Sequence, residues 1–275
     1  MKKFTFLIAV LLVVALFINH FSDRAIYHPI KEVAPLPSGF EEICFDNAVN
    51  QKLCAAYKPA PQGRPTILLF HGNSGNISYY NTFARLYAYY GYGVFMFDYQ
   101  GFGKSEGKLN QANFFEDARS ALDFLITKEN IPPNDIILFA HSLGNAALIE
   151  AALAYNDLPF KAVIMQSPFT NTPDMAASFF MGKPYNHDSF YRKVLSAVFR
   201  PLLANKLFDN ISKISELKHP VFMLYSRQDM LIPWQMSDAL FQKAPQGSKN
   251  FISPYGGHND FEWGVDAVND YIKSL

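Results

Sequence analysis

The sequence predicts an α/β fold built on a mostly parallel, doubly wound sheet. Along most of its 275 residues, short apolar runs alternate with stretches whose composition favours helices. The apolar runs show no polar alternation, which is typical of parallel strands that are covered on both faces. A repeated strand–helix order of this kind places helices on both sides of one sheet.

Composition favours one large globular domain. Hydrophobic residues make up 49% of the chain and charged residues 17%, which supplies a core and argues against disorder. The net charge is zero, so the basic excess of a nucleic-acid-binding protein is missing. The sequence has no His, Cys, Asp and Glu cluster with metal-ligand spacing, and no G-x-G-x-x-G after a strand. We therefore expect no metal, no cofactor and no nucleic-acid partner.

Residues 1–21 predict a membrane anchor. Lys2 and Lys3 precede the uncharged run 4–18, and the next three residues bring this run close to the length of a membrane span. A clean A-x-A cleavage site is missing, which favours an uncleaved signal anchor over a cleaved signal peptide. If both lysines stay cytoplasmic, the rest of the chain lies on the non-cytoplasmic side, in a periplasm or a lumen.

Residues 22–40 predict an extended tether between this anchor and a domain at 41–275. The tether contains Pro29, Pro35, Pro37 and Gly39, which disfavour regular helices and strands.

An antiparallel hairpin opens the domain, and its two cysteines predict a disulfide. Cys44 and Cys54 lie equally far from residue 49, in the expected turn, so they face each other across the two strands. Opposed Cβ atoms are about 4.5–5.5 Å apart, close to the range of a disulfide. The alternative is a pair of free buried thiols.

Six apolar runs account for the remaining strands. They lie at 66–70, 94–98, 136–140, 162–166, 221–225 and 249–253. The helices expected between them lie at 79–90, 112–128, 143–155, 234–243 and 262–272. The stretch 169–215 is too long for an ordinary connection and is rich in aromatic and helix-forming residues. We interpret about 171–215 as a helical lid insertion.

A serine stands where one of these strands meets a helix. The segment Ala140-His141-Ser142-Leu143-Gly144 matches the nucleophile-elbow pattern G-x-S-x-G, with alanine at the first position. Small residues are needed because the turn is strained, and alanine is compatible with it. The helix that follows directs its dipole at the point where negative charge develops. The sequence therefore predicts an α/β-hydrolase fold with Ser142 as the nucleophile.

The loop 71–75, with the sequence His-Gly-Asn-Ser-Gly, follows the strand 66–70. This fold places one donor of the oxyanion hole in that loop and the second directly after the nucleophile. We therefore predict the backbone N–H groups of Asn73 and Leu143 as the two donors. The ring of His71 is expected to brace the loop.

A base and an acid complete the predicted triad. Asp229 follows the strand 221–225 and His258 follows the last strand, which gives the chain order Ser, Asp, His that is typical of this fold. The histidine would remove the serine proton, and the carboxylate would orient the imidazole. Asp98, at the end of an earlier strand, is the alternative acid. His141 adjoins the serine, but its side chain is expected to point away from the tip of the elbow.

Several motifs in the same order resemble the membrane-anchored α/β-hydrolases related to the abhydrolase-domain depalmitoylases and the monoacylglycerol lipases. They are the loop 71–76, the segment 98–107 (DYQGFGKSEG), the segment 167–170 (SPFT) and the elbow. The likeness covers roughly 40–275 and implies a serine triad and an N-terminal hydrophobic segment. Ala140 at the first elbow position and Ser226 before the acid depart from the family pattern.

These residues predict a serine hydrolase that cleaves an acyl ester or thioester through an acyl-enzyme intermediate. The expected substrate is a small molecule, a lipid or an acylated protein, reached by an enzyme tethered to a membrane. One alternative is a serine peptidase or amidase on the same triad. A non-catalytic, membrane-bound binding protein is the other, and the intact triad argues against it. The sequence leaves open the acyl length and the oligomeric state.

Overall fold

The computed structural model of the protein describes residues 26–181, 189–203 and 207–275. The predicted anchor at 1–21 lies outside these ranges, as do residues 22–25 of the predicted tether. Among the helices within the described ranges, none combines the length and the apolar character needed to cross a bilayer. The anchor therefore stays a prediction.

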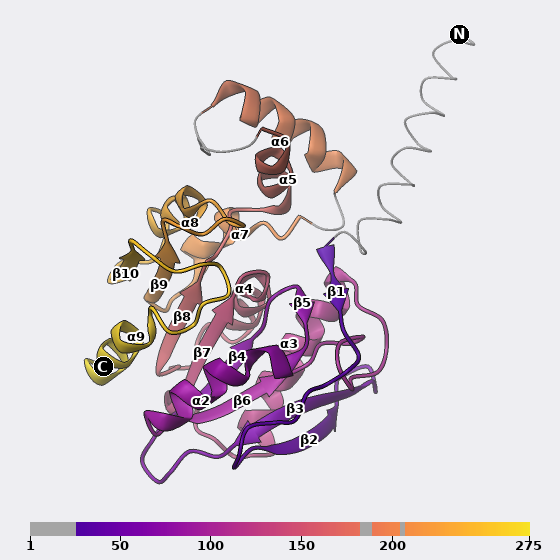
Figure 1. The fold of residues 1–275 in the computed structure, drawn as a ribbon, viewed down its shortest axis with the longest axis vertical. Coiled ribbons are helices and arrows are strands. Elements are labelled where there is room, and N and C mark those ends of the chain that lie inside the picture. The colour runs from indigo at the N-terminus through magenta and orange to yellow at the C-terminus, as the bar shows by residue number, and fades with distance from the viewer. Residues whose placement is uncertain (1–25, 182–188, 204–206) are drawn as a thin grey trace.

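An eight-stranded sheet forms the centre of the molecule (Figure 1), in the order β10-β9-β8-β7-β4-β6-β3-β2. The six strands from β10 to β6 run parallel, and β3 and β2 extend the sheet antiparallel at one edge. The predicted doubly wound, mostly parallel sheet with an antiparallel N-terminal hairpin is confirmed.

The observed bounds follow the predicted ones closely. The strands of the sheet are β2 (Glu41–Asp46), β3 (Lys52–Lys58), β4 (Thr66–Phe70), β6 (Gly93–Phe97), β7 (Ile136–His141), β8 (Ala162–Gln166), β9 (Val221–Ser226) and β10 (Lys249–Ser253). The helices are α2 (Asn81–Tyr89), α3 (Gln111–Thr127), α4 (Gly144–Ala154), α5 (Thr172–Met181), α6 (Phe190–Leu202), α7 (Asn210–Lys213), α8 (Trp234–Phe241) and α9 (Val265–Lys273). Within the described residues, three short 3-10 helices also form: η1 (Ile77–Tyr80), η2 (Pro133–Asp135) and η4 (Ile214–Glu216).

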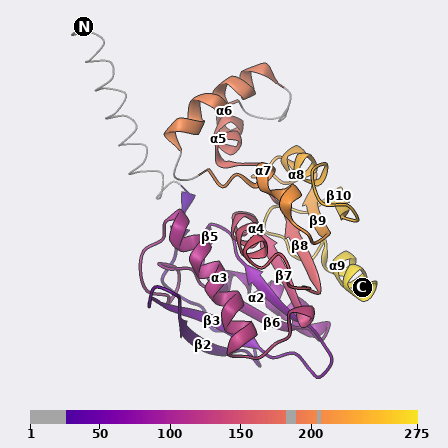
Figure 2. The ribbon, with the colours of Figure 1, turned by 180° about the vertical axis from the view of Figure 1, so that it is seen from behind.

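Two apolar layers explain why the strand sequences lack alternation. Leu68 and Phe95 point into a core shared with α3, α4 and α8, whereas their neighbours Ile67 and Val94 point into a core shared with α2 and α9. Figures 1 and 2 show these helices on opposite faces of the sheet. Because both faces are covered, every position of these strands is selected for apolar character.

The β2–β3 hairpin contains the predicted disulfide. Cys44 and Cys54 are direct partners in the antiparallel register and are joined by an S–S bond. The structure therefore contains the disulfide and not the alternative pair of free thiols.

Two segments at one end of the molecule lie outside the sheet. The described part of the predicted tether is bound to the domain, because β1 (His28–Pro29) pairs in parallel with β5 (Ser74–Gly75) in a separate two-stranded sheet. Helices α5 and α6 lie between β8 and β9 in the chain, within the predicted lid insertion. Both ribbon views show α5 and α6 standing apart from the sheet, at the end where β1 lies (Figures 1 and 2).

Candidate active site

Ser142 occupies a sharp turn between β7 and α4. Its φ of 55° is in the left-handed region, which only the tight strand–turn–helix geometry explains for a serine. A Cβ at Gly144 would overlap the carbonyl oxygens of Phe70 and His71, so glycine is required there. Ala140, in contrast, is accommodated as the buried fifth residue of β7. The predicted elbow is formed despite the alanine.

The structure brings the predicted base and acid to this serine. The Nε2 atom of His258 lies 2.9 Å from the Oγ of Ser142, and its Nδ1 lies 2.7 Å from the Oδ2 of Asp229. Since a carboxylate only accepts hydrogen bonds, the neutral imidazole carries its proton on Nδ1. Nε2 is then free to accept the serine proton, as a general base must. The arrangement is the predicted one, and the catalytic roles of these side chains stay predictions.

The surroundings of Asp229 favour its ionised form. Burial alone would raise its pKa, but the hydrogen bond and charge of His258 outweigh burial and lower the pKa of this carboxyl. The backbone N–H groups of Leu231 and Ile232 add to this effect, since both donate to Oδ1 at 2.8 Å. Each carboxylate oxygen thus has its own partners, which fixes the orientation of the imidazole.

The alternative acid, Asp98, does not reach His258. Its Oδ1 accepts the N–H of Ile77 and lies 3.4 Å from the Nε2 of His71. Both side chains are fully buried. His71 also hydrogen-bonds the carbonyl of Gly72 through Nδ1, at 2.8 Å, which agrees with the expected bracing role.

The two predicted oxyanion donors border the same space as the serine hydroxyl. Asn73 follows β4 and Leu143 follows Ser142, and both line the pocket described below. Within the described part of the chain, neither backbone N–H donates to a protein group. Both remain available for a substrate oxygen, as an oxyanion hole requires.

A polar network that no sequence motif indicated connects the loop 71–75, which we call the oxyanion loop, with the loop that carries His258. His141 is buried beside His258, with ring centroids 4.8 Å apart, and hydrogen bonds join it to Tyr80 and His258. Burial, and then the nearby His258, lower the pKa of His141 to about 3, so the ring is neutral. Its Nε2–H donates to the carbonyl of His258, and Nδ1 accepts the hydroxyl of Tyr80, whose oxygen accepts the N–H of Gly72. His141 thus links the oxyanion loop to the loop that carries the base.

Ser226, a departure from the family pattern, supports the acid and the base together. Its hydroxyl donates to the carbonyl of Tyr255, three residues before His258, at 3.0 Å. It also accepts the N–H of Gln228, next to Asp229. A glycine at this position would lack both contacts, and no sequence motif pointed to them.

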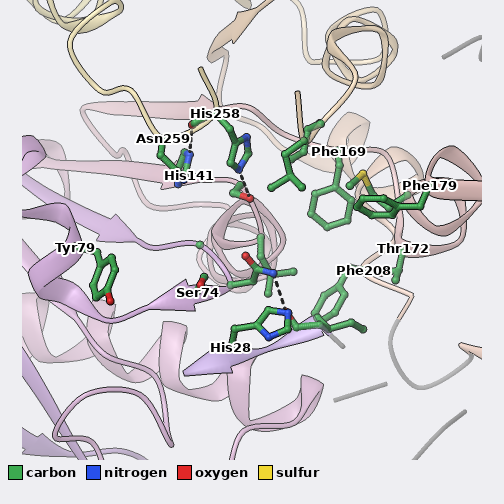
Figure 3. A pocket seen from close by; sticks show the side chains of 18 of the residues that line it. His28, Ser74, Tyr79, His141, Phe169, Thr172, Phe179, Phe208, His258 and Asn259 are labelled. Carbon is green, nitrogen blue, oxygen red and sulfur yellow. Dashed lines mark hydrogen bonds between the residues drawn. The ribbon is translucent and has the colours of Figure 1, made fainter. Parts of the chain in front are cut away.

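A cavity of about 720 Å³ opens at this edge of the sheet (Figure 3). That volume lies within the roughly 300–1,000 Å³ typical of small-molecule sites. Most of the wall is apolar: Ile26, Tyr79, Leu143, Phe169, Met175, Ala176, Phe179, Leu203, Phe208, Leu231, Ile232 and Phe261. Among the described residues of the wall, none is Asp, Glu, Lys or Arg. The cavity therefore suits an uncharged, apolar group placed next to Ser142.

Helix α5 of the predicted lid insertion forms part of this wall, and a buried ion pair joins it to α6. Asp174 on α5 and Arg192 on α6 form this pair, and both side chains are 6% exposed. Asp174 also accepts hydrogen bonds from the side chains of Thr170 and Asn171. Outside the pocket, α6 exposes Phe190 and Tyr191 by nearly three quarters.

A family model described as serine aminopeptidase, S33, matches residues 61–214, which is more than half of the chain. The uncharacterised protein YfhR of Salmonella typhimurium is 28% identical over 273 residues, covering 94% of this chain and 88% of its own length. Protein bem46 of Schizosaccharomyces pombe is 31% identical over 203 residues, covering 73% of this chain and 64% of its own.

Solved structures share the fold at low sequence identity. An esterase of Pyrococcus furiosus superposes with a TM-score of 0.68 at 16% identity, over 91% of this chain and 98% of that one. The mouse α/β hydrolase domain-containing protein 10 gives a TM-score of 0.62 at 16% identity, over 86% and 98%. The expected α/β-hydrolase fold is thereby confirmed.

Proposed function

The chain belongs to the family described as serine aminopeptidase, S33, and is a hydrolase; from this premise we propose that it cleaves acyl esters or thioesters. The observation that carries the proposal is the hydrogen-bonded chain Ser142–His258–Asp229 beside an apolar cavity. A nucleophile next to a large apolar wall favours substrates with an apolar acyl group, because burial of that group supplies binding energy.

The mechanism proceeds through an acyl-enzyme. Ser142 Oγ attacks the acyl carbon while its proton passes to His258 Nε2, and the carbonyl oxygen gains negative charge. The N–H groups of Asn73 and Leu143 stabilise this oxyanion, a contribution that is often worth 10²–10³ in kcat per donor. His258 then donates the proton to the leaving alcohol or thiol. A water molecule, deprotonated by His258, releases the carboxylic acid and regenerates Ser142.

Aminopeptidase activity is the second candidate, and the name of the family favours it. A free substrate amine is positively charged, and desolvating it is costly unless a carboxylate pairs with it. The described wall of the cavity contains no carboxylate. Asp229, which is close by, is hydrogen-bonded to His258 and does not line the cavity. This absence supports the ester or thioester over the aminoacyl substrate.

A fluorophosphonate probe and a panel of chromogenic substrates test the proposal. We expect the wild type to be labelled and to cleave p-nitrophenyl esters at least 10²-fold faster than aminoacyl p-nitroanilides. Ser142→Ala is expected to lose labelling and at least 10³-fold in kcat, with an unchanged melting temperature. Faster turnover of the aminoacyl anilides would favour the peptidase, and equal turnover by the alanine variant would refute the serine mechanism.

We also propose that residues 1–21 hold the enzyme at a membrane, with its active site on the non-cytoplasmic side. The Cys44–Cys54 disulfide supports this location, because disulfides persist in oxidising compartments. The apolar residues on α6 are also compatible with a nearby lipid surface. Fractionation of cells that express the full chain tests the idea: recovery in the membrane fraction, lost on deletion of residues 1–21, is expected. Recovery of the full chain in the soluble fraction would refute it.

A further inference from the structure

The segment 26–35, which we call the N-terminal strap, lies along the loop that contains Asn73. The N–H of His28 donates to the carbonyl of Asn73 at 2.8 Å. The side-chain amide of Asn73 donates in return to the carbonyl of Ile26 at 2.9 Å. Asn73 is therefore held by its carbonyl and its side chain, while its own N–H is left for the pocket.

A second clasp fixes the strap two residues further on. The N–H of Ile30 donates to the carbonyl of Gly75 at 2.9 Å. The side-chain amide of Asn76, which is fully buried, donates to the carbonyls of Ile30 and Glu32 at 2.9 and 2.8 Å. These bonds fix the register between the strap and the loop.

Both ends of the strap are also anchored. At the start, the buried ring of Tyr27 packs against Phe114 and Phe208, with centroids 6.0 and 6.3 Å away. At the far end, the side-chain amide of Asn81 donates to the carbonyl of Pro35 at 3.0 Å. A linker that merely passed the domain would not need an aromatic anchor and a series of directional bonds.

His71 and Tyr80 hold the start of the loop, at Gly72, and the strap holds its second half. Its strand β5 belongs to a two-stranded sheet whose other member is β1, so within the described residues the strap is its strand partner. The strap also forms part of the pocket wall through Ile26 and His28, and Figure 3 draws His28 and His258 on opposite sides of the pocket. Loss of the strap would leave the loop free to shift.

We propose that the N-terminal strap is a positioning element of the active site, which holds the Asn73 N–H at the oxyanion. This inference rests on the proposed function, because it requires that this N–H stabilises an oxyanion. Such a donor must lie about 2.7–3.1 Å from the oxyanion, and a displacement of 1 Å can cost 10²-fold in rate. The strap therefore affects kcat although none of its groups takes part in the chemistry.

Two matched variants of the full chain test the proposal. Asn73→Ala keeps the backbone donor and removes the amide bond to Ile26. Asn156→Ala removes a similar side-chain amide bond, to the carbonyl of Glu216, away from both the strap and the pocket. The measurements are kcat and KM on a short p-nitrophenyl ester, the affinity for an aryl trifluoromethyl ketone, whose adduct carries an oxyanion, and the melting temperature.

For Asn73→Ala we expect kcat to fall about 10- to 30-fold with KM changed by less than about threefold. Affinity for the trifluoromethyl ketone should fall by a similar factor, since it depends on the same donor. Asn156→Ala should stay within about twofold of the wild type. Equal effects of the two variants, or a loss of kcat without a loss of ketone affinity, would overturn the proposal.

If Asn73→Ala does not fold, His28→Pro replaces it, because proline removes the N–H that donates to the Asn73 carbonyl and leaves Asn73 intact. The changes in kcat, KM and ketone affinity expected for Asn73→Ala are then expected for His28→Pro, and the same results would overturn the proposal. Failure of the proposed function is recognised separately, because turnover by the wild type would then be independent of Ser142.

Discussion

The N-terminal strap and helix α5, which is paired with α6 in the predicted lid insertion, both border the pocket, but the protein holds them differently. The strap is tied along its length to the loop that contains Asn73, and at its far end to Asn81 on α2, by backbone and amide hydrogen bonds. The lid helices are joined to each other by the buried Asp174–Arg192 pair and expose aromatic side chains. A wall that positions a donor needs many directional bonds, whereas a wall that receives an apolar group needs shape and apolar surface.

The largest expected effect concerns the lid. Arg192→Met would leave Asp174 buried without its charged partner, and breaking such a pair costs about 3–5 kcal/mol. Because α5 and α6 stand apart from the sheet, we expect this loss to appear locally. Hydrogen exchange should accelerate in α5 and α6 and stay unchanged in β4, β7 and the strap. Equal acceleration in the strap would mean that the two regions are one cooperative unit.

The strap should respond differently to the loss of its central clasp. Asn76→Ala removes the two amide bonds to the carbonyls of Ile30 and Glu32, and the two bonds that Ser78 donates to the side-chain oxygen of Asn76. This loss is expected to cost about 2–3 kcal/mol of stability, although the Ile30 carbonyl keeps the N–H of Gly103. We also expect kcat to fall by a similar factor for short and long acyl esters. Urea unfolding and an ester series measure both. A loss confined to long esters would assign the strap to substrate binding.

Acid should destabilise the folded protein through His141, which Tyr80 connects to the loop that the strap holds. Its pKa is lowered to about 3 in the folded state, mainly by burial, and returns to about 6.5 on unfolding. Below pH 6.5 the unfolded chain binds the extra proton, so stability falls as the pH falls. Between pH 6.5 and 4.5 this residue should cost about 2 kcal/mol. In His141→Asn the loss over that range, followed by urea unfolding, should be smaller by this amount; an identical loss would contradict the assignment.

The smallest effect concerns the size of the pocket. Ala176 on α5 lines the cavity, and Ala176→Trp would fill part of it. We expect the ratio of kcat/KM for long over short p-nitrophenyl esters to fall about tenfold, or about 1.4 kcal/mol. Comparison with Tyr89→Trp, at an exposed position on α2, controls for the added indole. An unchanged ratio would place the acyl group elsewhere.

The regular elements of the fold could be predicted from the sequence, whereas the long-range contacts of the strap could not. The strands were predicted within about one residue because burial on both faces leaves continuous apolar runs, as at 66–70 and 136–140. Ser142, Asp229 and His258 were found because a parallel sheet brings the carboxyl ends of its strands to one edge. Their chain order then selected Asp229 over Asp98.

The strap and the His141 network could not be predicted in this way. The prolines at 29, 35 and 37 predicted an extended segment without regular structure, but the strap forms the two-residue strand β1, because backbone bonds to a distant loop leave no periodic pattern in the sequence. For His141, the expectation was only that the ring points away from the elbow tip. The contact of that ring with His258 depends on where the last loop returns, which the sequence does not encode locally.

The presence of Ile26 in the pocket wall has a practical consequence for handling the protein. Any affinity tag, fluorophore or immobilisation linker joined directly ahead of Ile26 would begin at the wall of the cavity. The carboxyl terminus leaves from α9, whose residues take no part in that wall, and Leu275 is exposed. Attachment at Leu275 should therefore leave the cavity unobstructed.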